Sequence, residues 1–302
     1  MKKSLTRKLA IAIIALVFAV VSLSTSTYAW FTMSDTANVD SFEATVKSAE
    51  GIEIGVTKLE NDSVTQWYVG EVPSQAIKAV AEDADFKFEA ITPNTIAYNN
   101  PTFKDQFNGE KTSGWVSFFV HIKAAQAGTV SIDDIALTTT NPSTWTVTAP
   151  YQGTKNVNYA VNDVAQYEVA DAARVALITT QKDVQYFEKD ATDAKTENGV
   201  KYAGNTVGIT ETNGAYAYYN AINPNNPLDD DNKSSYQTYL INGDLGIVKD
   251  EIVVDLGSVA ADEILTIQVL VWVEGWDAEC LNAIFEQTLK VDLDFKYTAN
   301  NN

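Results

Sequence analysis

Short segments in which apolar and polar residues alternate recur along this chain, and they constrain its fold more than any other feature. Alternation with a period of two is typical of a strand that buries one face. It is cleanest at 288–297, where every second side chain is apolar and the side chains between them are mostly charged. Residues 115–124 are instead apolar on both faces, which indicates a central strand covered on both sides.

Similar segments predict further strands at 39–47, 51–57, 129–137, 144–148, 174–179, 184–188, 251–256 and 264–274. Only short helices are expected, at 163–172 and 278–285. Residues 150–250 are less regular and rich in Asn, Gly, Asp and Tyr, so we expect an irregular insertion with long loops there. The predicted fold is all-β, a jelly-roll-like antiparallel β-sandwich with a few short helices and long loop insertions.

The N-terminus has the pattern of an export signal. A basic segment at 2–8 precedes an apolar run at 9–21, which is shorter than the roughly 20 residues that cross a bilayer as a helix. Thr27 and Ala29 place small residues at positions −3 and −1 of a cleavage site between Ala29 and Trp30. We therefore expect a signal peptidase to remove this segment, with an uncleaved anchor as the alternative.

Cleavage would leave one β-sandwich domain, residues 30–302, which begins directly with a strand segment at 30–47. No second long apolar segment or C-terminal sorting signal is found. We therefore expect a secreted protein, extracellular or associated with the cell surface, that has no stable membrane anchor once residues 1–29 are removed.

The charge of the chain limits its partners. It carries 40 acidic and 21 basic residues, a net charge of −19, and the signal segment contributes basic residues only. Nucleic acids and anionic membranes both require a basic footprint, so neither is an expected partner. The acidic excess favours solubility outside the cell, with divalent-cation binding as the alternative.

Residues that commonly carry catalysis are scarce. Cys280 is the only cysteine, so no intrachain disulfide exists, and its apolar neighbours favour burial of the thiol. His121 is the only histidine, which excludes two-histidine zinc motifs, and no Gly-x-Ser-x-Gly motif is present for a Ser-His-Asp triad. A dyad of Cys280 with His121 stays open on sequence alone, but no catalytic residue is predicted.

Glu274 and Asp277 are the most interesting acidic pair, because they follow a predicted buried strand. They could serve as the two carboxyl groups of a glycosidase. We favour a structural role instead, in which Asp277 caps the next helix by accepting from backbone N–H groups.

Two further features suggest ligands. Asp229, Asp230 and Asp231 loosely resemble a calcium loop, since hard cations prefer several carboxylate oxygens, although a solvated acidic loop is the simpler interpretation. Calcium is therefore the one candidate cofactor. The six tryptophans could form a sugar-stacking platform, but three of them lie in predicted strands and favour core packing: Trp115, Trp145 and Trp272.

Both ends of the chain carry a resemblance to a known family. Thr-Tyr-Ala-Trp-Phe-Thr at 27–32, Val-Asp-Ser-Phe at 39–42 and Gly-Ile-Glu-Ile at 51–54 resemble the TasA/camelysin-like exported proteins of Gram-positive bacteria, whose signal peptides are cut by a SipW-type peptidase. The segment Val-Trp-Val-Glu-Gly-Trp-Asp-Ala-Glu-Cys at 271–280 is similar to an element of clostridial members. Between residues 58 and 250 the chain resembles the family only in its general character, without matching segments of this kind.

The resemblance implies a non-enzymatic subunit of an extracellular fibre or of a biofilm or surface matrix. In such proteins the strand freed by cleavage completes the sheet of the next subunit, which gives a head-to-tail homopolymer. Phe42, Ala44 and Val46 alternate on one face of the first strand segment. The residues of this segment that are expected to join subunits are Trp30, Phe31, Val39, Phe42, Ala44 and Val46. The proteolytic activity ascribed to camelysins is not expected, because no zinc ligand set is found. A secreted carbohydrate- or calcium-binding surface module is the alternative function, and a hydrolase built on Glu274 and Asp277 is a third.

Overall fold

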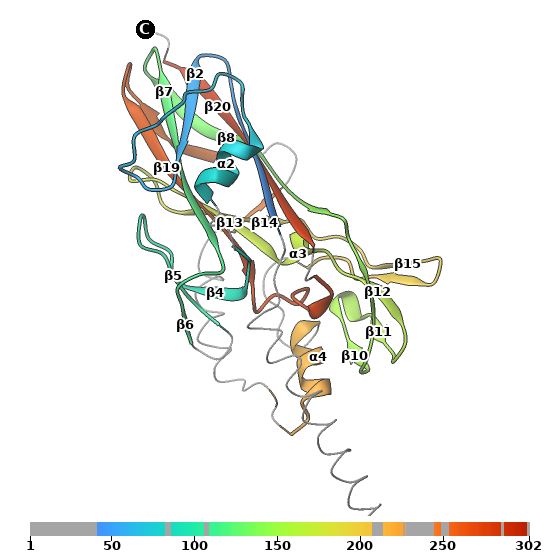
Figure 1. Cartoon of the computed structure of the whole chain (residues 1–302). Helices are drawn as coiled ribbons and strands as arrows, with labels where there is room; N and C mark the ends of the chain where they lie inside the picture. The colour runs from blue at the N-terminus through green and yellow to red at the C-terminus, as the bar shows by residue number, and fades with distance from the viewer. Residues whose placement is uncertain are drawn as a thin grey trace, which may run out of the picture.

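The structure is a computed structural model of the whole chain (Figure 1). It describes residues 41–81, 86–105, 109–206, 214–225, 227, 245–248, 254–284 and 287–300. Strands dominate, and the few helices are short, which confirms the predicted all-β class and sandwich architecture.

The first sheet has the strand order β18-β8-β20-β1-β3. Its strands are β1 (Ser41–Ser48), β3 (Glu71–Val72), β8 (Gly128–Thr140), β18 (Val254–Val259) and β20 (Thr288–Ala299). β20 lies antiparallel to β8, whereas β1 lies parallel to β20 in a register that runs from Ser41 opposite Thr288 to Ser48 opposite Phe295. This sheet is thus antiparallel except for the β1–β20 pair, a parallel pairing that the alternation did not indicate.

The second sheet has the order β17-β14-β13-β19-β7-β2. Its strands are β2 (Ile52–Thr57), β7 (Val116–Ala124), β13 (Ala173–Ile178), β14 (Gln185–Lys189), β17 (Leu245–Val248) and β19 (Ile264–Glu274). β7 lies between β2 and β19, as its two apolar faces predicted. Within the 150–250 range, expected to be irregular with long loops, β13 and β14 correspond to the strands predicted at 174–179 and 184–188, and β17 adds a further strand to this sheet.

Burial follows the alternation. One cluster of buried side chains takes members from both sheets, among them Val120 and Ile122 of β7 and Leu289, Val291 and Leu293 of β20. A second, smaller cluster covers the other face of the second sheet. It is formed by Ile91, Ile96, Phe103, Ala176, Ile178, Leu270 and Trp272. β19 is therefore covered on both faces, which explains why it is the most apolar strand.

That second face is partly covered by a small strand extension at the end of β19. It consists of β4 (Ala90–Thr95), β5 (Thr102–Lys104) and β6 (Glu110–Lys111). β4 runs parallel to the last two residues of β19 and antiparallel to β5, and Phe103 of β5 stacks on Trp115 with ring centroids 4.5 Å apart. Helix α2 (Ser74–Ala81) packs on β1 and β7 instead.

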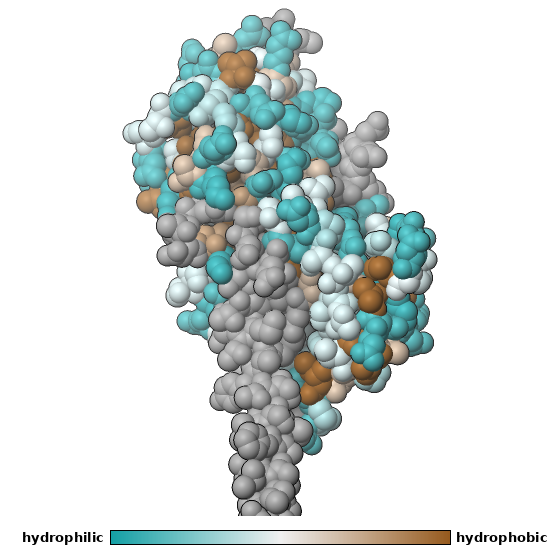
Figure 2. Space-filling model, turned by 45° about the vertical axis from the view of Figure 1, so that its right-hand side comes forward, coloured by the Kyte–Doolittle hydropathy of each residue, from teal (hydrophilic) through white to brown (hydrophobic). Residues whose placement is uncertain are grey.

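A lobe of short elements lies at the end of the molecule farthest from β2 in Figure 1. Its elements are β9 (Thr144–Thr146), β10 (Tyr151–Gln152), η1 (Thr154–Asn156), β11 (Asn158–Tyr159), β12 (Val164–Gln166), β15 (Lys195–Glu197), β16 (Val200–Tyr202) and α4 (Ala215–Ile222). Aromatic side chains form its core; Tyr151 stacks on Tyr159 with centroids 4.8 Å apart. On the face shown in Figure 2, most residues are hydrophilic and apolar residues are scattered among them.

Both predicted helices are shorter than expected. Within 163–172 the chain first forms β12, because Val164 and its neighbours pair with β9 and β16, and only α3 (Val169–Ala172) is helical. In 278–284, the described part of the second range, the chain forms turns and the 3₁₀ turn η2 (Asn282–Ile284). Tertiary contacts override helix propensity at both places.

Candidate functional site

The expected subunit-joining strand corresponds to β1 in the described part of the chain. Phe42, Ala44 and Val46 lie on one face of β1 and are 1%, 2% and 0% exposed, respectively. They join the main core, where the ring of Phe42 meets Phe88 edge-on at a centroid distance of 6.0 Å. The structure therefore brings these three predicted residues together on one buried surface. Ala29, Trp30, Phe31 and Val39 lie outside the described residues.

β1 occupies a slot whose walls come from distant parts of the chain. On one side, β20 pairs with β1 along all of its residues. On the other side, Val46 lies opposite Val72 of β3, and the Ser48 N–H donates to the Gly70 carbonyl oxygen at 2.6 Å. α2 covers the slot and buries Ile77 completely. No disulfide ties β1 to these walls, because the chain has a single cysteine.

The outward face of β1 is polar and weakly held. Glu43 and Lys47 are exposed, and the Lys47 Nζ lies 3.7 Å from an Asp294 carboxylate oxygen. Exposed ion pairs of this kind contribute little stability, typically below about 1 kcal/mol. The attachment of β1 therefore depends on its buried face and its backbone pairing.

Glu274 and Asp277 lie in a buried charge cluster that is centred on Arg174. The Arg174 Nη2 donates to Asp277 Oδ2 at 2.5 Å and forms an ion pair with Glu188, whose Oε2 lies 2.7 Å away. Asp277 Oδ1 also accepts the backbone N–H of Glu279 at 2.8 Å. Glu274 accepts from Trp272 Nε1 at 3.1 Å and from the Trp276 N–H at 3.2 Å. Asp277 therefore does accept from backbone, as the capping interpretation predicted, but in a turn rather than at a helix.

Burial dominates the electrostatics of this cluster. It raises the pKa of Glu274 to about 7, an effect that its hydrogen bonds and Arg174 only partly offset. Burial and the neighbouring Asp277 also raise the pKa of Glu279 well above its usual range. Burial disfavours the charged guanidinium of Arg174, but the carboxylates of Asp277 and Glu188 outweigh this, and its pKa is raised. A permanently charged Arg174 thus holds two carboxylates in the interior.

Neither carboxyl of the proposed hydrolase pair is exposed; Glu274 and Asp277 have no accessible surface. Their oxygens are engaged by Arg174, by Trp272 and by backbone N–H groups. Sequence reasoning found this pair but missed Arg174 and Glu188. The available signal was a charged residue at the start of the apolar segment 174–178 and another at the end of 184–188, since charges within buried strands usually have partners.

The two other candidate reactive residues lie apart. His121 is buried in β7, with Nε2 2.8 Å from Thr57 Oγ1 and Nδ1 3.1 Å from Thr266 Oγ1, and burial lowers its pKa. Cys280 is buried near the charge cluster, and burial together with Asp277 raises the pKa of its thiol. A thiol with a raised pKa is a poor nucleophile.

The tryptophans mainly serve packing. Trp272 has no exposed surface, and Trp115 and Trp145 are partly buried against other aromatic rings. Among the residues that the structure describes, no group of three or more His, Cys, Asp or Glu side chains could hold a metal ion. Asp229, Asp230 and Asp231, the candidate calcium ligands, lie outside those residues. None of the helices in the described ranges has the length and apolar character of a membrane span.

Comparisons with protein-family models, with curated proteins and with solved structures give no match for this chain. The slot that holds β1 and the charge cluster around Arg174 are therefore interpreted from their geometry alone.

Proposed function

We propose that this protein is an exported, non-enzymatic structural subunit of an extracellular fibre or surface matrix, and that its first strand segment, residues 30–47, joins one subunit to the next. The observation that carries the proposal is β1: its apolar face is buried, yet the strand lies near the N-terminus of the expected mature chain and has no disulfide to its slot. The resemblance of residues 27–54 to exported TasA/camelysin-like proteins supports the same function.

Exchange of β1 between copies changes the free energy little. An incoming strand from a second copy makes the same contacts with β20, β3 and α2 that the resident strand makes, so the two bound states have similar free energy. Backbone donors and acceptors of β20 supply a template for any strand of matching pattern. A strand passed from each copy to the next makes a heterologous contact that does not close, and such contacts generate filaments.

An empty slot is costly, which sets a barrier to exchange. Exposing Phe42 and Val46 alone forfeits about 3 to 6 kcal/mol of hydrophobic burial, at about 1.5–3 kcal/mol for each large side chain. The eight paired positions of β1 with β20 add the loss of backbone hydrogen bonds. We therefore expect slow exchange that speeds up when the subunit is mildly destabilised.

A cysteine pair placed across the slot tests the proposal. Val46 and Val72 are direct partners on antiparallel strands, a separation that suits a disulfide. In Val46→Cys/Val72→Cys, oxidation of the monomer should lock β1 in its own slot and stop assembly, and reduction should restore it. Oxidation after assembly should instead link each β1 to the β3 of another copy and give a ladder of covalent oligomers on non-reducing gels.

The matched control is Thr196→Cys/Lys201→Cys, which joins the antiparallel partners of the β15–β16 hairpin far from the slot. Its disulfide should stay within one chain before and after assembly and leave assembly unchanged. Assembly that proceeds normally from oxidised Val46→Cys/Val72→Cys monomers would refute exchange of β1. The readouts are electron microscopy of the mature protein and sedimentation.

A further inference from the structure

The segment 275–281 joins the second sheet to the lobe of short elements. It follows β19 directly, and Arg174 of β13 holds its Asp277 through a hydrogen bond of 2.5 Å. On the lobe side, the Ala278 carbonyl oxygen accepts the N–H of Ala215, the first residue of α4, at 2.7 Å. One short segment therefore fixes α4 to the end of β19.

Glu279 lies inside this contact and has no accessible surface. From the lobe, the Thr206 hydroxyl donates to Glu279 Oε1 at 3.4 Å, and the Thr154 hydroxyl of η1 is a further hydrogen-bonding neighbour. From the side of the sheet, its hydrogen-bonding neighbour is the carboxyl group of Asp277. The side chain of Glu279 thus bridges the lobe and the charge cluster around Arg174.

An ionised Glu279 would lack a counter-ion in this place. Its buried Oε2 atom accepts no hydrogen bond from the described residues. The neighbouring cationic groups are already paired with other carboxylates: Arg174 with Asp277 and Glu188, and Lys189 with Asp171 and Glu168. A buried carboxylate without a cation or enough donors is strongly disfavoured, and such a group takes up a proton instead.

A proton on Oε2 gives this oxygen a partner. The carboxylic acid of Glu279 then donates to the Asp277 carboxylate, which stays ionised because Arg174 binds it. Two carboxyl groups that share one site hold a proton between them, because like charges so close together cannot both form. A metal ion is the other way to neutralise such a pair, but no group of three or more His, Cys, Asp or Glu side chains in the described ranges could hold one.

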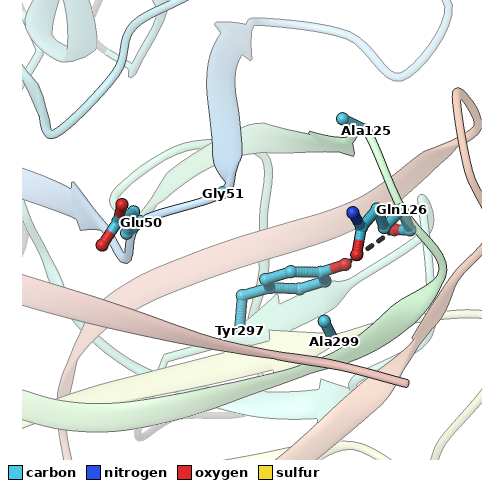
Figure 3. A pocket seen from close by; sticks show the side chains of 6 residues that line it. All are labelled: Glu50, Gly51, Ala125, Gln126, Tyr297 and Ala299. Atoms are coloured by element: carbon cyan, nitrogen blue, oxygen red, sulfur yellow. Dashed lines mark hydrogen bonds between the residues drawn. The ribbon is translucent and has the colours of Figure 1, made fainter. Parts of the chain in front are cut away.

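The open hollow at the other end of the sandwich makes no comparable demand. It has a volume of about 360 Å³ and is lined by Glu50, Gly51, Ala125, Gln126, Tyr297 and Ala299. Figure 3 shows the Tyr297 side chain beside it, where the Tyr297 hydroxyl donates to the Gln126 carbonyl oxygen at 2.7 Å. None of the polar side-chain atoms of these lining residues is both buried and without a hydrogen bond, whereas Glu279 Oε2 meets both conditions.

We infer that a protonated Glu279 holds the lobe against the second sheet by donating a hydrogen bond to Asp277, and that loss of this proton as pH rises loosens the lobe. Once Glu279 is ionised, it changes from a donor into a buried charge without a counter-ion, and it repels Asp277 across the contact. The 275–281 segment is then a pH-sensitive latch between two parts of one subunit. The inference does not depend on the exchange of β1.

The groups that face Glu279 set the direction of the response. Burial is the main cause that raises its pKa above the 4.5 of the free side chain; Asp277 and Asp171 raise it further, and Thr154 opposes them. The folded state therefore binds the proton more tightly than the unfolded state, so the lobe is held best in acid and less well as pH rises. Asp171, whose pKa burial raises to about 6, loses its own proton in the same range and adds to the negative charge facing Glu279.

Two further titratable groups face Glu279. One is the phenol of Tyr159 in β11, whose pKa burial raises from 10.0. The other is the thiol of Cys280, whose pKa burial raises well above 9.0. A pH series that ends at about pH 9 therefore leaves both groups neutral.

Amide hydrogen exchange of the mature protein, followed by mass spectrometry between about pH 5 and about pH 9, tests the latch. Each exchange rate is divided by the intrinsic rate at the same pH, which gives the protection of each peptide. Ionisation favours opening tenfold for each unit by which the pKa is raised, so peptides containing α4 should lose at least about tenfold of their protection as pH rises. Peptides from β2 and β7, which pair with each other in the same sheet, should keep theirs.

Glu279→Gln separates the proton from the shape of the side chain. The Gln amide donates to Asp277 at every pH, and its oxygen still accepts from Thr206. In this variant α4 should therefore stay protected up to about pH 9.

The matched control is Glu274→Gln. It removes the other buried carboxyl group with a raised pKa beside this segment, and that group is bound by Trp272 and the Trp276 N–H rather than by the lobe. This variant should lose the protection of α4 with rising pH as the wild type does.

Protection of α4 that does not change with pH in the wild type would overturn the inference, and so would an equal loss in β2 and β7, which would mean a general loss of stability. An undiminished loss in Glu279→Gln would assign the titration to another group and overturn it too. Calcium that restores the protection of α4 at about pH 9 would place a cation, not a proton, between the two carboxyl groups. The wild-type comparison needs no variant, and none of these measurements involves assembly, so their failure would leave the proposed function untouched.

Discussion

Replacing Glu274 by Gln should make the stability of the protein less dependent on pH. The folded-state pKa of Glu274 is about 7, against 4.5 for the free side chain, because its carboxyl group is buried. Between these values the folded state binds the proton more tightly than the unfolded state, so stability falls as pH rises through this window and is constant above it. One pKa unit corresponds to 1.36 kcal/mol, so the wild type should lose about 2 to 3 kcal/mol from this group between pH 5 and pH 8.5.

Urea unfolding of both proteins at several pH values measures this difference. The Gln amide replaces one oxygen that accepts from Trp272 or from the Trp276 N–H, and the loss of this hydrogen bond lowers the stability of Glu274→Gln by an amount that does not depend on pH. The titration of Glu274 adds a pH-dependent part, so the difference in stability between the two proteins should move by about 2 to 3 kcal/mol in favour of the variant as pH rises. Asp171, whose pKa burial raises to about 6, contributes equally to both proteins. Parallel stability curves for the two proteins would refute a buried, titrating Glu274.

Three further predictions concern the core, the charge cluster and the thiol. Phe42→Ala should lower the free energy of unfolding by about 3 to 5 kcal/mol, measured by urea titration, because it leaves a cavity in the slot of β1. Arg174→Met should cost about 3 to 5 kcal/mol at pH 7, measured by urea titration, because Glu188 and Asp277 lose the guanidinium that they share. Cys280 should not react with a coloured thiol reagent in the native protein and should react fully in urea.

The alternation of apolar and polar residues in the sequence predicted which face of a strand is buried. The alternation at 288–297 predicted the buried face of β20, and the alternation of Phe42, Ala44 and Val46 predicted that of β1. Each of these strands has one covered face, and since successive side chains of a strand point to opposite faces, the apolar residues recur with a period of two. The parallel pairing of β1 with β20 was not predictable in this way, because a hydrophobic pattern says which face is buried and not which strand lies alongside.

The charge cluster shows a second limit. Glu274 and Asp277 are close in sequence, so their pairing was visible, but the group that decides their role is Arg174, which lies on another strand of the same sheet. Without Arg174 the pair resembles two catalytic carboxyl groups. With it, Asp277 is the counter-ion of a buried guanidinium, and Glu274 is a buried acid held by Trp272. Distinguishing these interpretations requires the tertiary structure.

The slot of β1 should control the rate of an assembly more than its equilibrium. Because β1 makes the same slot contacts in its own subunit as in another, those contacts nearly cancel in the equilibrium and instead set the height of the barrier to exchange. The net free energy of assembly must then come from surface that is newly covered when two copies meet. Phe42→Ala should accordingly change the rate of assembly more than its midpoint concentration. Measuring both quantities for the variant and for the wild type separates the contribution of the slot from that of the newly covered surface.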